Sequence, residues 1–386
     1  MKSGILLLLF VLVLTNSIAQ VVSKTVNLSS GGSLSSSLSV DEKSKITKLT
    51  ITGKTDARDF KCMRDELGLL NDIDLSNVEI VAYSGTEGTL GSSKSYSANQ
   101  LPEYSFTNSL TSKGKTSLQK ILLPNTLTEI GNYAFQECTG LLEIVVPNSV
   151  TAIGEGAFKG CTNMLKATLS NSITKIDNTV FYRCYGLTSF TIPGSVTQIG
   201  SSSFYLCTNL AAIVIPNSVK SIGDHAFEGC GWMTDVKIGK SVEVIGTEAF
   251  KDCISLKNLS VNQMKGPVIN QGTFSGVQKW LVNFEVPIGA APNYSGTAYW
   301  NEFSSIKEKD LTTGIDQISA NQLKIFAGQG EIIVNGSMSD ENICVYTLTG
   351  SLIKQLKYTG NWVSIPVYKS GVYLVKTRSN SVKVVI

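Results

Sequence analysis

Apolar and polar positions repeat with a fixed period through the middle of the chain. Between Leu118 and Cys253, the unit L-x-x-I-x-I-P-x-S-V-x-x-I-G-x-x-A-F-x-x-C returns every 23 residues. The alternation at 144–146 predicts a short strand, and Pro147 ends it because proline cannot donate a hydrogen bond to a strand ladder. The apolar positions within 150–153 predict a second short extended piece or a turn. The A-F-x-x-C string then places a small residue, a ring and a sulfur on the inside.

A glycine precedes the A-F-x-x-C string in most copies, at Gly131, Gly154, Gly200, Gly223 and Gly246. It fits a tight corner, where a side chain would clash or φ must be positive. Asp177 replaces this glycine in one copy. A stack of repeats tolerates single defects because each repeat contacts only its neighbours. One unit cannot bury its apolar face alone, so we predict a β-rich repeat solenoid with parallel strands about 4.8 Å apart.

Six of the eight cysteines fall on this repeat: Cys138, Cys161, Cys184, Cys207, Cys230 and Cys253. We interpret them as an inward row of buried thiols, because free cysteine packs as a small hydrophobe. Neighbours in the row would be near enough for disulfides, but their parallel Cβ directions are unfavourable; disulfides remain the alternative. A straight row does not converge on one point, so no metal site is predicted.

Residues 20–105 have a different pattern, which predicts strand, helix, strand. The helix would follow Asp56 as its N-cap and run to about Leu67. The strands at 48–53 and 72–77 would then be parallel neighbours, with the helix as their crossover.

Three further features lie in this N-terminal region. Residues 84–100 are rich in glycine and serine and predict a flexible insertion. The string LPEYSF at 101–106 is interpreted as a degenerate first repeat. Cys62, on the predicted helix, is expected to be buried rather than reactive.

The strings EIGNYAFQEC (129–138) and AIGEGAFKGC (152–161) resemble the BspA-type leucine-rich repeats of secreted bacterial proteins, especially of the Bacteroidetes. The resemblance covers about half of the chain. It implies an N-terminal α/β cap at 20–105 and a solenoid at 106–310. Within the solenoid, 286–306 resembles the closing segment, with Tyr294, Trp300 and Phe303 covering the last repeat.

Residues 314–386 contain short alternating strands divided by Gly, Asn and Ser, which predicts a small Ig-like β-sandwich. The strings at 345–355 and 370–377 resemble the C-terminal sorting domain of the Bacteroidetes type IX secretion route. The Pro-Asn-Pro opening of that domain is missing, so an Ig-like accessory domain remains an equal alternative.

The first residues predict export. Lys2, an apolar run at 5–14 and small residues before Gln20 are typical of a secretory signal peptide, here 1–19. The run is too short to anchor the chain in a bilayer, and no integral membrane segment is predicted after cleavage. We expect a secreted, cell-surface or outer-membrane-associated protein, with the periplasm as the alternative.

Charge and chemistry exclude several classes of function. The chain has 33 basic and 30 acidic residues without a basic cluster, which argues against a nucleic-acid partner.

His225 is the only histidine, so an HExxH zinc site is excluded. It occupies a variable slot that other repeats fill with Gly156 or Glu248, and we interpret it as part of a solvent-facing turn. No G-x-S-x-G, P-loop or C-x-x-C string is present, so we predict neither an enzyme nor a cofactor.

The remaining signal is surface variation along the first strand of each repeat. Two outward rows vary strongly, and their members form the predicted binding face: Lys120, Leu122, Glu143, Val145, Lys166, Thr168, Thr191, Val214, Asp235 and Lys237. The second row also includes Ser260, and Leu122, Val145 and Val214 are its apolar members. A solvated strand does not need exposed apolar residues, although a lateral contact between two copies could also cover them.

We therefore expect a surface protein that adheres to host matrix proteins or other cells, as the family resemblance implies. One alternative is a structural scaffold of the cell envelope without an external ligand. Glycan capture ranks lower because neither row contains Tyr or Trp. The sequence does not identify the ligand or the oligomeric state.

Overall fold

The computed structural model of the protein describes residues 21–311 and parts of the chain beyond them. Those parts are 324–327, 331–335, 339–347, 351–359, 363–366, 372–376 and 381–385. The predicted signal peptide lies outside the described residues. The chain divides into two compact units, the first ending at Asp310 and the second beginning at Leu311.

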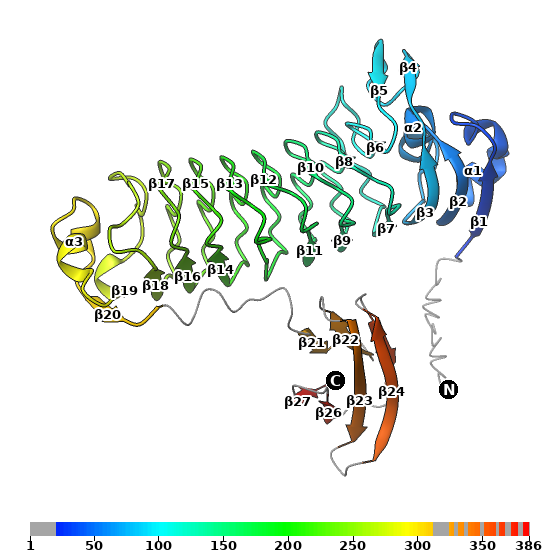
Figure 1. The fold of residues 1–386 in the computed structure, drawn as a ribbon. Coiled ribbons are helices and arrows are strands. Elements are labelled where there is room, and N and C mark those ends of the chain that lie inside the picture. The colour runs from blue at the N-terminus through cyan, green and yellow to red at the C-terminus, as the bar shows by residue number, and fades with distance from the viewer. Residues whose placement is uncertain are drawn as a thin grey trace, which may run out of the picture. The chain divides into compact units, whose positions relative to one another are not determined.

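The N-terminal region forms a parallel sheet whose crossovers contain the helices α1 and α2 (Figure 1). Its elements are β1 (Ser23–Leu28), the 3-10 turn η1 (Ser35–Ser37), α1 (Val40–Lys45), β2 (Lys48–Thr55), α2 (Ala57–Asp65) and β3 (Asp72–Ile80). The predicted parallel pairing of β2 with β3 is confirmed. The Asp56 side chain accepts a hydrogen bond from the Arg58 backbone N–H at 2.9 Å, as an N-cap does. The helix ends two residues before Leu67, which instead lies in the core.

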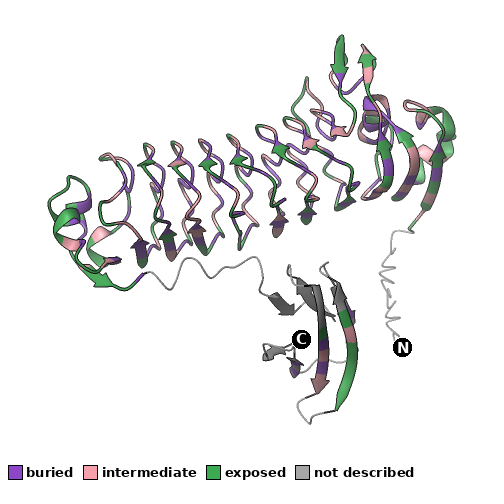
Figure 2. Cartoon of the chain, viewed as in Figure 1, coloured by how far each residue is buried: buried purple, intermediate pink, exposed green. Residues whose placement is uncertain are grey.

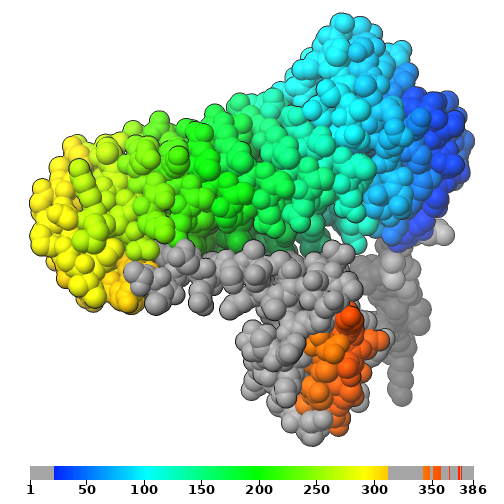
Figure 3. All heavy atoms as spheres, viewed as in Figure 1, coloured from blue at the N-terminus to red at the C-terminus, as the bar shows by residue number. Residues whose placement is uncertain are grey.

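The expected flexible insertion at 84–100 is wrong. Part of it forms an antiparallel hairpin of β4 (Tyr83–Gly85) and β5 (Lys94–Tyr96), which projects from the N-terminal end of the first unit (Figures 1 and 3). The rings of Tyr83 and Tyr96 stack 6.1 Å apart, and the Arg58 guanidinium lies 4.6 Å from the Tyr83 ring centroid. These aromatic contacts give the glycine- and serine-rich segment a core of its own, which its composition conceals.

The repeats stack into a solenoid with two separate rows of strands (Figure 1). The first row contains β7 (Lys120–Leu122), β9 (Glu143–Val145), β11 (Lys166–Thr168), β14 (Ala212–Ile215), β16 (Asp235–Ile238), β18 (Asn258–Val261), β19 (Asn283–Pro287) and β20 (Ile306–Lys309). The second contains β6 (Gln100–Leu101), β8 (Glu129–Ile130), β10 (Ala152–Ile153), β12 (Lys175–Ile176), β13 (Gln198–Ile199), β15 (Ser221–Ile222) and β17 (Val244–Ile245). The repeat solenoid is therefore confirmed, and β3 pairs with β7 to join it to the N-terminal sheet.

Both rows of strands are interrupted. Residues 188–193 form no strand, and Phe190 stands where other repeats have isoleucine or valine; its ring packs edge-on against Phe181 and Phe204. In the second row, β10 does not pair with β12, the strand that precedes Asp177. At this corner a Cβ on Gly154 would lie 2.6 Å from the Asn132 backbone nitrogen, so close approach, and not a positive φ, requires glycine.

A third ladder, formed by the A-F-x-x-C turns, continues without interruption; we call it the turn ladder. In residues 131–137, the backbone N–H groups of Tyr133, Phe135 and Glu137 donate to carbonyl oxygens of the next repeat at 2.7–2.9 Å. The next four turns make the same three bonds, and in the last turn Phe250 and Asp252 donate to Thr273 and Ser275. All these donors point toward the C-terminal neighbour.

Each turn contains two residues in the left-handed region. The first slot has φ between 53° and 59° at Tyr133, Gly156, Thr179, Ser202, His225 and Glu248. The second slot is occupied by Glu137, Gly160, Arg183, Leu206, Gly229 and Asp252. Most occupants are not glycine, so the turn ladder maintains a backbone conformation that costs L-residues roughly 1–2 kcal/mol each.

Buried residues run through every repeat of the solenoid (Figure 2). Aromatic rings and thiols are prominent among those behind the turn ladder. From Phe106 to Phe274 the repeat phenylalanines stack with ring centroids 5.1–5.5 Å apart. The six repeat cysteines are free and fully buried, which confirms the predicted row of thiols. Each Sγ donates to the carbonyl oxygen of the phenylalanine one repeat earlier, at 3.2–3.5 Å.

Other residues cover both ends of this stack of rings and thiols. At the N-terminal end, the Arg64 Nη1 lies within 3.0 Å of the carbonyl oxygens of Thr89, Tyr104 and Thr107. The Lys115 ammonium donates to the Leu67 carbonyl, and burial lowers the pKa of Lys115 to about 8.

At the C-terminal end, the chain forms η2 (Lys279–Leu281), α3 (Ala291–Ser295) and η3 (Trp300–Glu302). Trp300 and Phe303 pack against Phe274, and Tyr294 contacts the Trp300 ring; all three rings are buried. This agrees with the predicted covering of the last repeat.

The second unit contains two antiparallel sheets. One consists of β21 (Lys324–Ala327), β22 (Glu331–Asn335) and β25 (Val363–Pro366), and the other of β24 (Leu352–Thr359), β23 (Ser339–Thr347), β26 (Val372–Lys376) and β27 (Ser381–Val385). These strands match those expected from the alternation, while the sandwich class and the sorting role stay predictions.

Replacing Thr179 with glycine should raise the stability of the solenoid by about 1 kcal/mol. Thr179 is β-branched at φ 56°, and its buried Oγ1 has no hydrogen-bond partner. Chemical denaturation of both proteins would measure the change. Thr174, an exposed threonine of the same repeat without a positive φ, is the matched control, and its change to glycine should destabilise. Loss of stability in both variants would contradict the strain argument.

Candidate functional site

The strand face consists of the outward side chains of β7, β9, β11, β14, β16 and β18. Alternation along each strand buries the central residue, such as Ile144, and turns its neighbours Glu143 and Val145 to solvent. The parallel register then aligns equivalent residues of successive repeats, for example Lys166 with Glu143 and Val214 with Lys237. The two predicted rows therefore exist as continuous lines of side chains wherever the strands pair.

The structure leaves each of the ten predicted binding residues accessible to solvent. Six are exposed (Lys120, Leu122, Glu143, Val145, Thr191 and Lys237) and four are half-buried (Lys166, Thr168, Val214 and Asp235). Two details differ from expectation: Thr191 lies in the repeat without a strand, and Ser260, at the end of the second row, is buried. The role of the ten residues in binding stays a prediction.

Exposed aliphatic residues gather in the first three regular repeats of the strand face. Leu122 is 42% exposed and Val145 is 56% exposed. Sequence reasoning missed Leu142 (44%) and Leu165 (56%), which precede β9 and β11 and are linked by a backbone hydrogen bond of 2.8 Å. They lie one residue before the strand, at a position where the repeat consensus specifies no residue type, so the sequence pattern does not mark them as exposed. We call these four residues the aliphatic patch.

The row beside the aliphatic patch alternates in charge. Lys48, Asp72 and Lys120 follow one another in register on β2, β3 and β7, and Glu143 and Lys166 do so on β9 and β11. An ion pair of 3.2 Å joins Lys48 and Asp72. Opposite charges on neighbouring strands neutralise one another, and exposed pairs of this kind contribute little to stability. The strand face is thus close to neutral, so its attraction for a partner depends chiefly on apolar contact.

Aromatic residues are exposed away from the strand face. Trp232, in the turn before β16, is 72% exposed. On the turn ladder, the rings of Tyr182 and Tyr205 stack 4.8 Å apart, and the Lys159 ammonium lies 5.1 Å from the Tyr182 ring centroid. Neither feature was predicted, because the sequence argument considered only the two strand rows.

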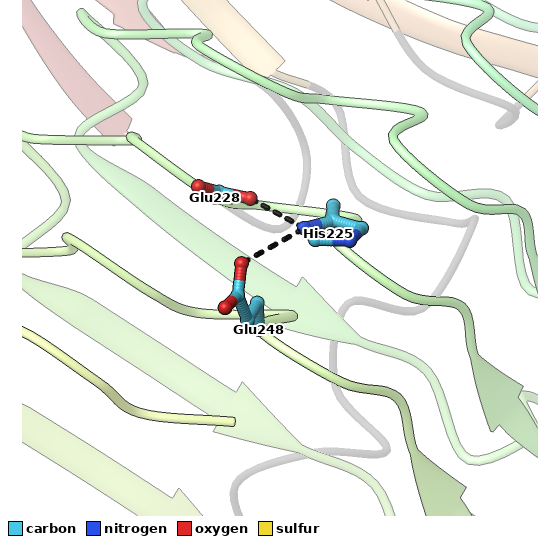
Figure 4. Close-up of side chains that lie close together, drawn as sticks. All are labelled: His225, Glu228 and Glu248. Carbon is cyan, nitrogen blue, oxygen red and sulfur yellow. Dashed lines mark hydrogen bonds and ion pairs between the residues drawn. The ribbon is translucent and has the colours of Figure 1, made fainter. Parts of the chain in front are cut away.

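The structure also gathers a polar cluster on the turn ladder, which consists of His225, Glu228, Glu248 and Lys251. Figure 4 shows the first three of these side chains. His225 and Glu248 hold the left-handed slot of successive turns, and Glu228 follows His225 by three residues. The His225 Nδ1 lies 2.5 Å from Glu228 Oε2 and 3.3 Å from Glu248 Oε2. The imidazole and the two carboxylates thus converge, although the sequence argument treated His225 as an isolated turn residue.

Lys251 lies between the two carboxylates of this cluster. Its Nζ is 2.9 Å from Glu248 Oε2 and 3.1 Å from Glu228 Oε1. The hydrogen bond to Glu248, followed by that to Glu228, raises the pKa of Lys251, and the same Lys251 bond lowers the pKa of Glu248. The cluster therefore keeps both carboxylates close to a cation.

The buried thiols are poor candidates for chemistry. Burial raises the pKa of Cys138 and of Cys253 to about 12, and that of Cys62 to about 12 as well. The thiolate is the form that attacks electrophiles and binds metals, so these residues are inert in the folded protein. The expectation that Cys62 is buried is confirmed.

Comparison with models of protein families assigns the chain to a family. The model of the BspA type leucine-rich repeat region, in six copies, matches residues 108–233 and 222–338. The match covers more than half of the chain, so the protein belongs to the BspA-type leucine-rich repeat family. Leucine-rich repeat proteins of this family are typically non-enzymatic surface proteins. No curated protein matches the chain.

Several solved structures are similar in part. A leucine-rich repeat protein of T. pallidum is 28% identical over 35% of this chain and 72% of its own, with a TM-score of 0.29. A leucine-rich cell surface protein of Faecalibacterium prausnitzii is 20% identical, over 68% and 83%, with a TM-score of 0.33. A leucine-rich repeat protein of Bacteroides ovatus is 18% identical, over 69% and 84%, with a TM-score of 0.28.

The thiols should differ sharply in reactivity. In the native protein at pH 8, we expect Cys344, which is only half-buried, to react with an aromatic disulfide reagent, while the seven buried cysteines stay unmodified. After unfolding in urea, all eight thiols should react. A thiol whose pKa is about 12 is ionised in only about one molecule in ten thousand at pH 8. Rapid modification of several thiols without denaturant would contradict the buried row.

Proposed function

We propose that the protein is exported and binds a protein ligand through its strand face, as an adhesion-type surface protein. Leucine-rich repeat domains generally mediate protein interactions, which supports the class of function. Among the described residues, no helix combines the length and apolar character needed to cross a bilayer. The proposed partner is a host matrix protein or a surface protein of another cell.

The aliphatic patch is the observation on which this proposal depends. Single exposed apolar residues are ordinary on protein surfaces, but Leu122, Leu142, Val145 and Leu165 follow one another over three adjacent repeats. They stand on a rigid stack, so a partner would lose little free energy in ordering them. The charged row beside them would set the orientation of the partner.

Contact would be non-covalent and distributed over several repeats. The six repeat cysteines are buried, so they are unavailable for covalent attachment in the folded state. A scaffold role within the cell envelope remains the alternative, in which the same patch would contact another envelope component.

Introducing charge into the aliphatic patch should weaken adhesion. In solid-phase binding to a panel of extracellular-matrix proteins, we expect Leu122→Lys with Val145→Lys to weaken binding at least about tenfold, because two ammonium groups would have to be desolvated. Val244→Lys is the matched control, because Val244 is 42% exposed, as Leu122 is, but lies on β17. Undiminished binding by the double variant would exclude the strand face.

Export should depend on the second unit if this unit is a sorting domain. We expect the full chain, expressed in a Bacteroidetes host, to be removed from the cell surface by protease, and a form lacking 314–386 to stay in the periplasm. Periplasmic retention of both forms would favour the scaffold alternative. Surface display of both would show that the second unit is an accessory domain.

A further inference from the structure

We propose that His225, Glu228 and Glu248 form a binding site for a divalent transition-metal ion, which links two successive repeats of the solenoid. Zn²⁺ is the ion that we would use to test it. This inference does not depend on the proposed adhesion function, because the polar cluster belongs to the turn ladder and not to the strand face.

The repeat itself makes this position unusual. The three slots are the left-handed residue of one turn, the residue three positions later, and the left-handed residue of the next turn. In the four preceding pairs of turns, the same three slots hold other combinations. In chain order these sets are Tyr133, Gln136 and Gly156; Gly156, Lys159 and Thr179; Thr179, Tyr182 and Ser202; and Ser202, Tyr205 and His225. Of these sets, the one at 225–248 is the only one in which all three residues are typical metal ligands.

The three ligand atoms lie near enough to one another to converge on one ion. The imidazole nitrogen and one oxygen of each carboxylate all lie within 4.8 Å of one another. Ligands that hold Zn²⁺ at about 2.0–2.1 Å in a tetrahedron are about 3.3 Å apart. The distance from His225 Nδ1 to Glu248 Oε2 is 3.3 Å, and that to Glu228 Oε2 is 2.5 Å, so the second pair needs to open by less than 1 Å.

Backbone hydrogen bonds hold the two turns that carry these side chains. The His225 N–H donates to the Thr247 carbonyl at 2.8 Å, which couples the two turns directly. The Glu228 N–H donates to the His225 carbonyl at 3.2 Å, which closes the turn that contains both. A site on such a scaffold loses little conformational entropy on binding.

Lys251 shows that the site already attracts a cation. Its ammonium contacts both carboxylates at 2.9 and 3.1 Å, at the end of a flexible side chain that is 30% exposed. A divalent ion would interact more strongly with two carboxylates than one ammonium does, and it would gain the imidazole nitrogen as a third ligand. Lys251 can leave for solvent when the ion binds.

The ligand set indicates the kind of ion. Imidazole nitrogen is a good ligand for zinc, copper and nickel, whereas magnesium and calcium prefer oxygen ligands alone. Three protein ligands leave at least one position for water. Because the three ligands come from two turns, a bound ion would add a cross-link between neighbouring repeats and would stabilise the folded state by mass action.

The test uses the untagged full chain, in which His225 is the only imidazole. We would titrate it with Zn²⁺ by calorimetry and follow the single histidine by NMR. We expect saturable binding at one site, a shift of the His225 imidazole resonances, and a melting temperature that rises with the concentration of Zn²⁺.

Variants distinguish this site from others. His225→Gly should fold, because Gly156 occupies the equivalent slot, and it should weaken Zn²⁺ binding at least about tenfold, as should Glu248→Gln. Lys251→Met should tighten binding, because it removes the competing ammonium. Glu243→Gln, at an exposed glutamate of the adjoining repeat, is the matched control and should change nothing.

Two results would overturn the proposal. One is the absence of saturable Zn²⁺ binding at millimolar concentration in both the natural chain and Lys251→Met. The other is Zn²⁺ binding that leaves the histidine resonances unchanged or that survives in His225→Gly, which would place the ion elsewhere in the chain.

Discussion

The unbroken hydrogen-bond ladder of the A-F-x-x-C turns is the interaction on which this fold depends. Both rows of strands are interrupted, one at 188–193 and the other between β10 and β12, yet the turn ladder passes both places. At the second break, Gly156 and Phe158 still donate to Asn178 and Val180 at 3.0 Å. Pairing between strands is therefore locally dispensable, while the turns keep successive repeats in register.

Opposing free energies explain why the turn ladder persists. Two left-handed residues cost each turn roughly 2–4 kcal/mol where neither is glycine. Three backbone hydrogen bonds contribute about 1 kcal/mol each, and the phenylalanine stack adds about 1 kcal/mol beyond the burial of its rings. Fully burying a phenylalanine contributes about 1.5–3 kcal/mol more. The gains exceed the cost only when copies stack, which makes the fold inseparable from its repetition.

The same regularity determines where function can vary. Core slots are filled by isoleucine, alanine, phenylalanine and cysteine, which leaves the outward slots free to differ. On the strand face this freedom produces the aliphatic patch beside an alternating row of charges. On the turn ladder it produces a tyrosine pair at one place and the polar cluster around His225 at another. Because the ladder donors all point one way, carbonyl groups are left at its N-terminal end, and Arg64 donates to one of them, that of Thr107.

The sequence by itself determined the solenoid and the buried cysteines through their spacing, and the crossover helix through its cap at Asp56. The covering role of Trp300 was implied by the family resemblance. The ten strand-face residues also followed from alternation alone. Tertiary structure alone decided the left-handed slots, the hairpin at 83–96, the exposure of Leu142 and Leu165, and the approach of His225 to Glu248. The physical reason is that these features arise between neighbouring repeats: a residue's partner lies about 23 positions away, and its distance depends on how closely two turns stack.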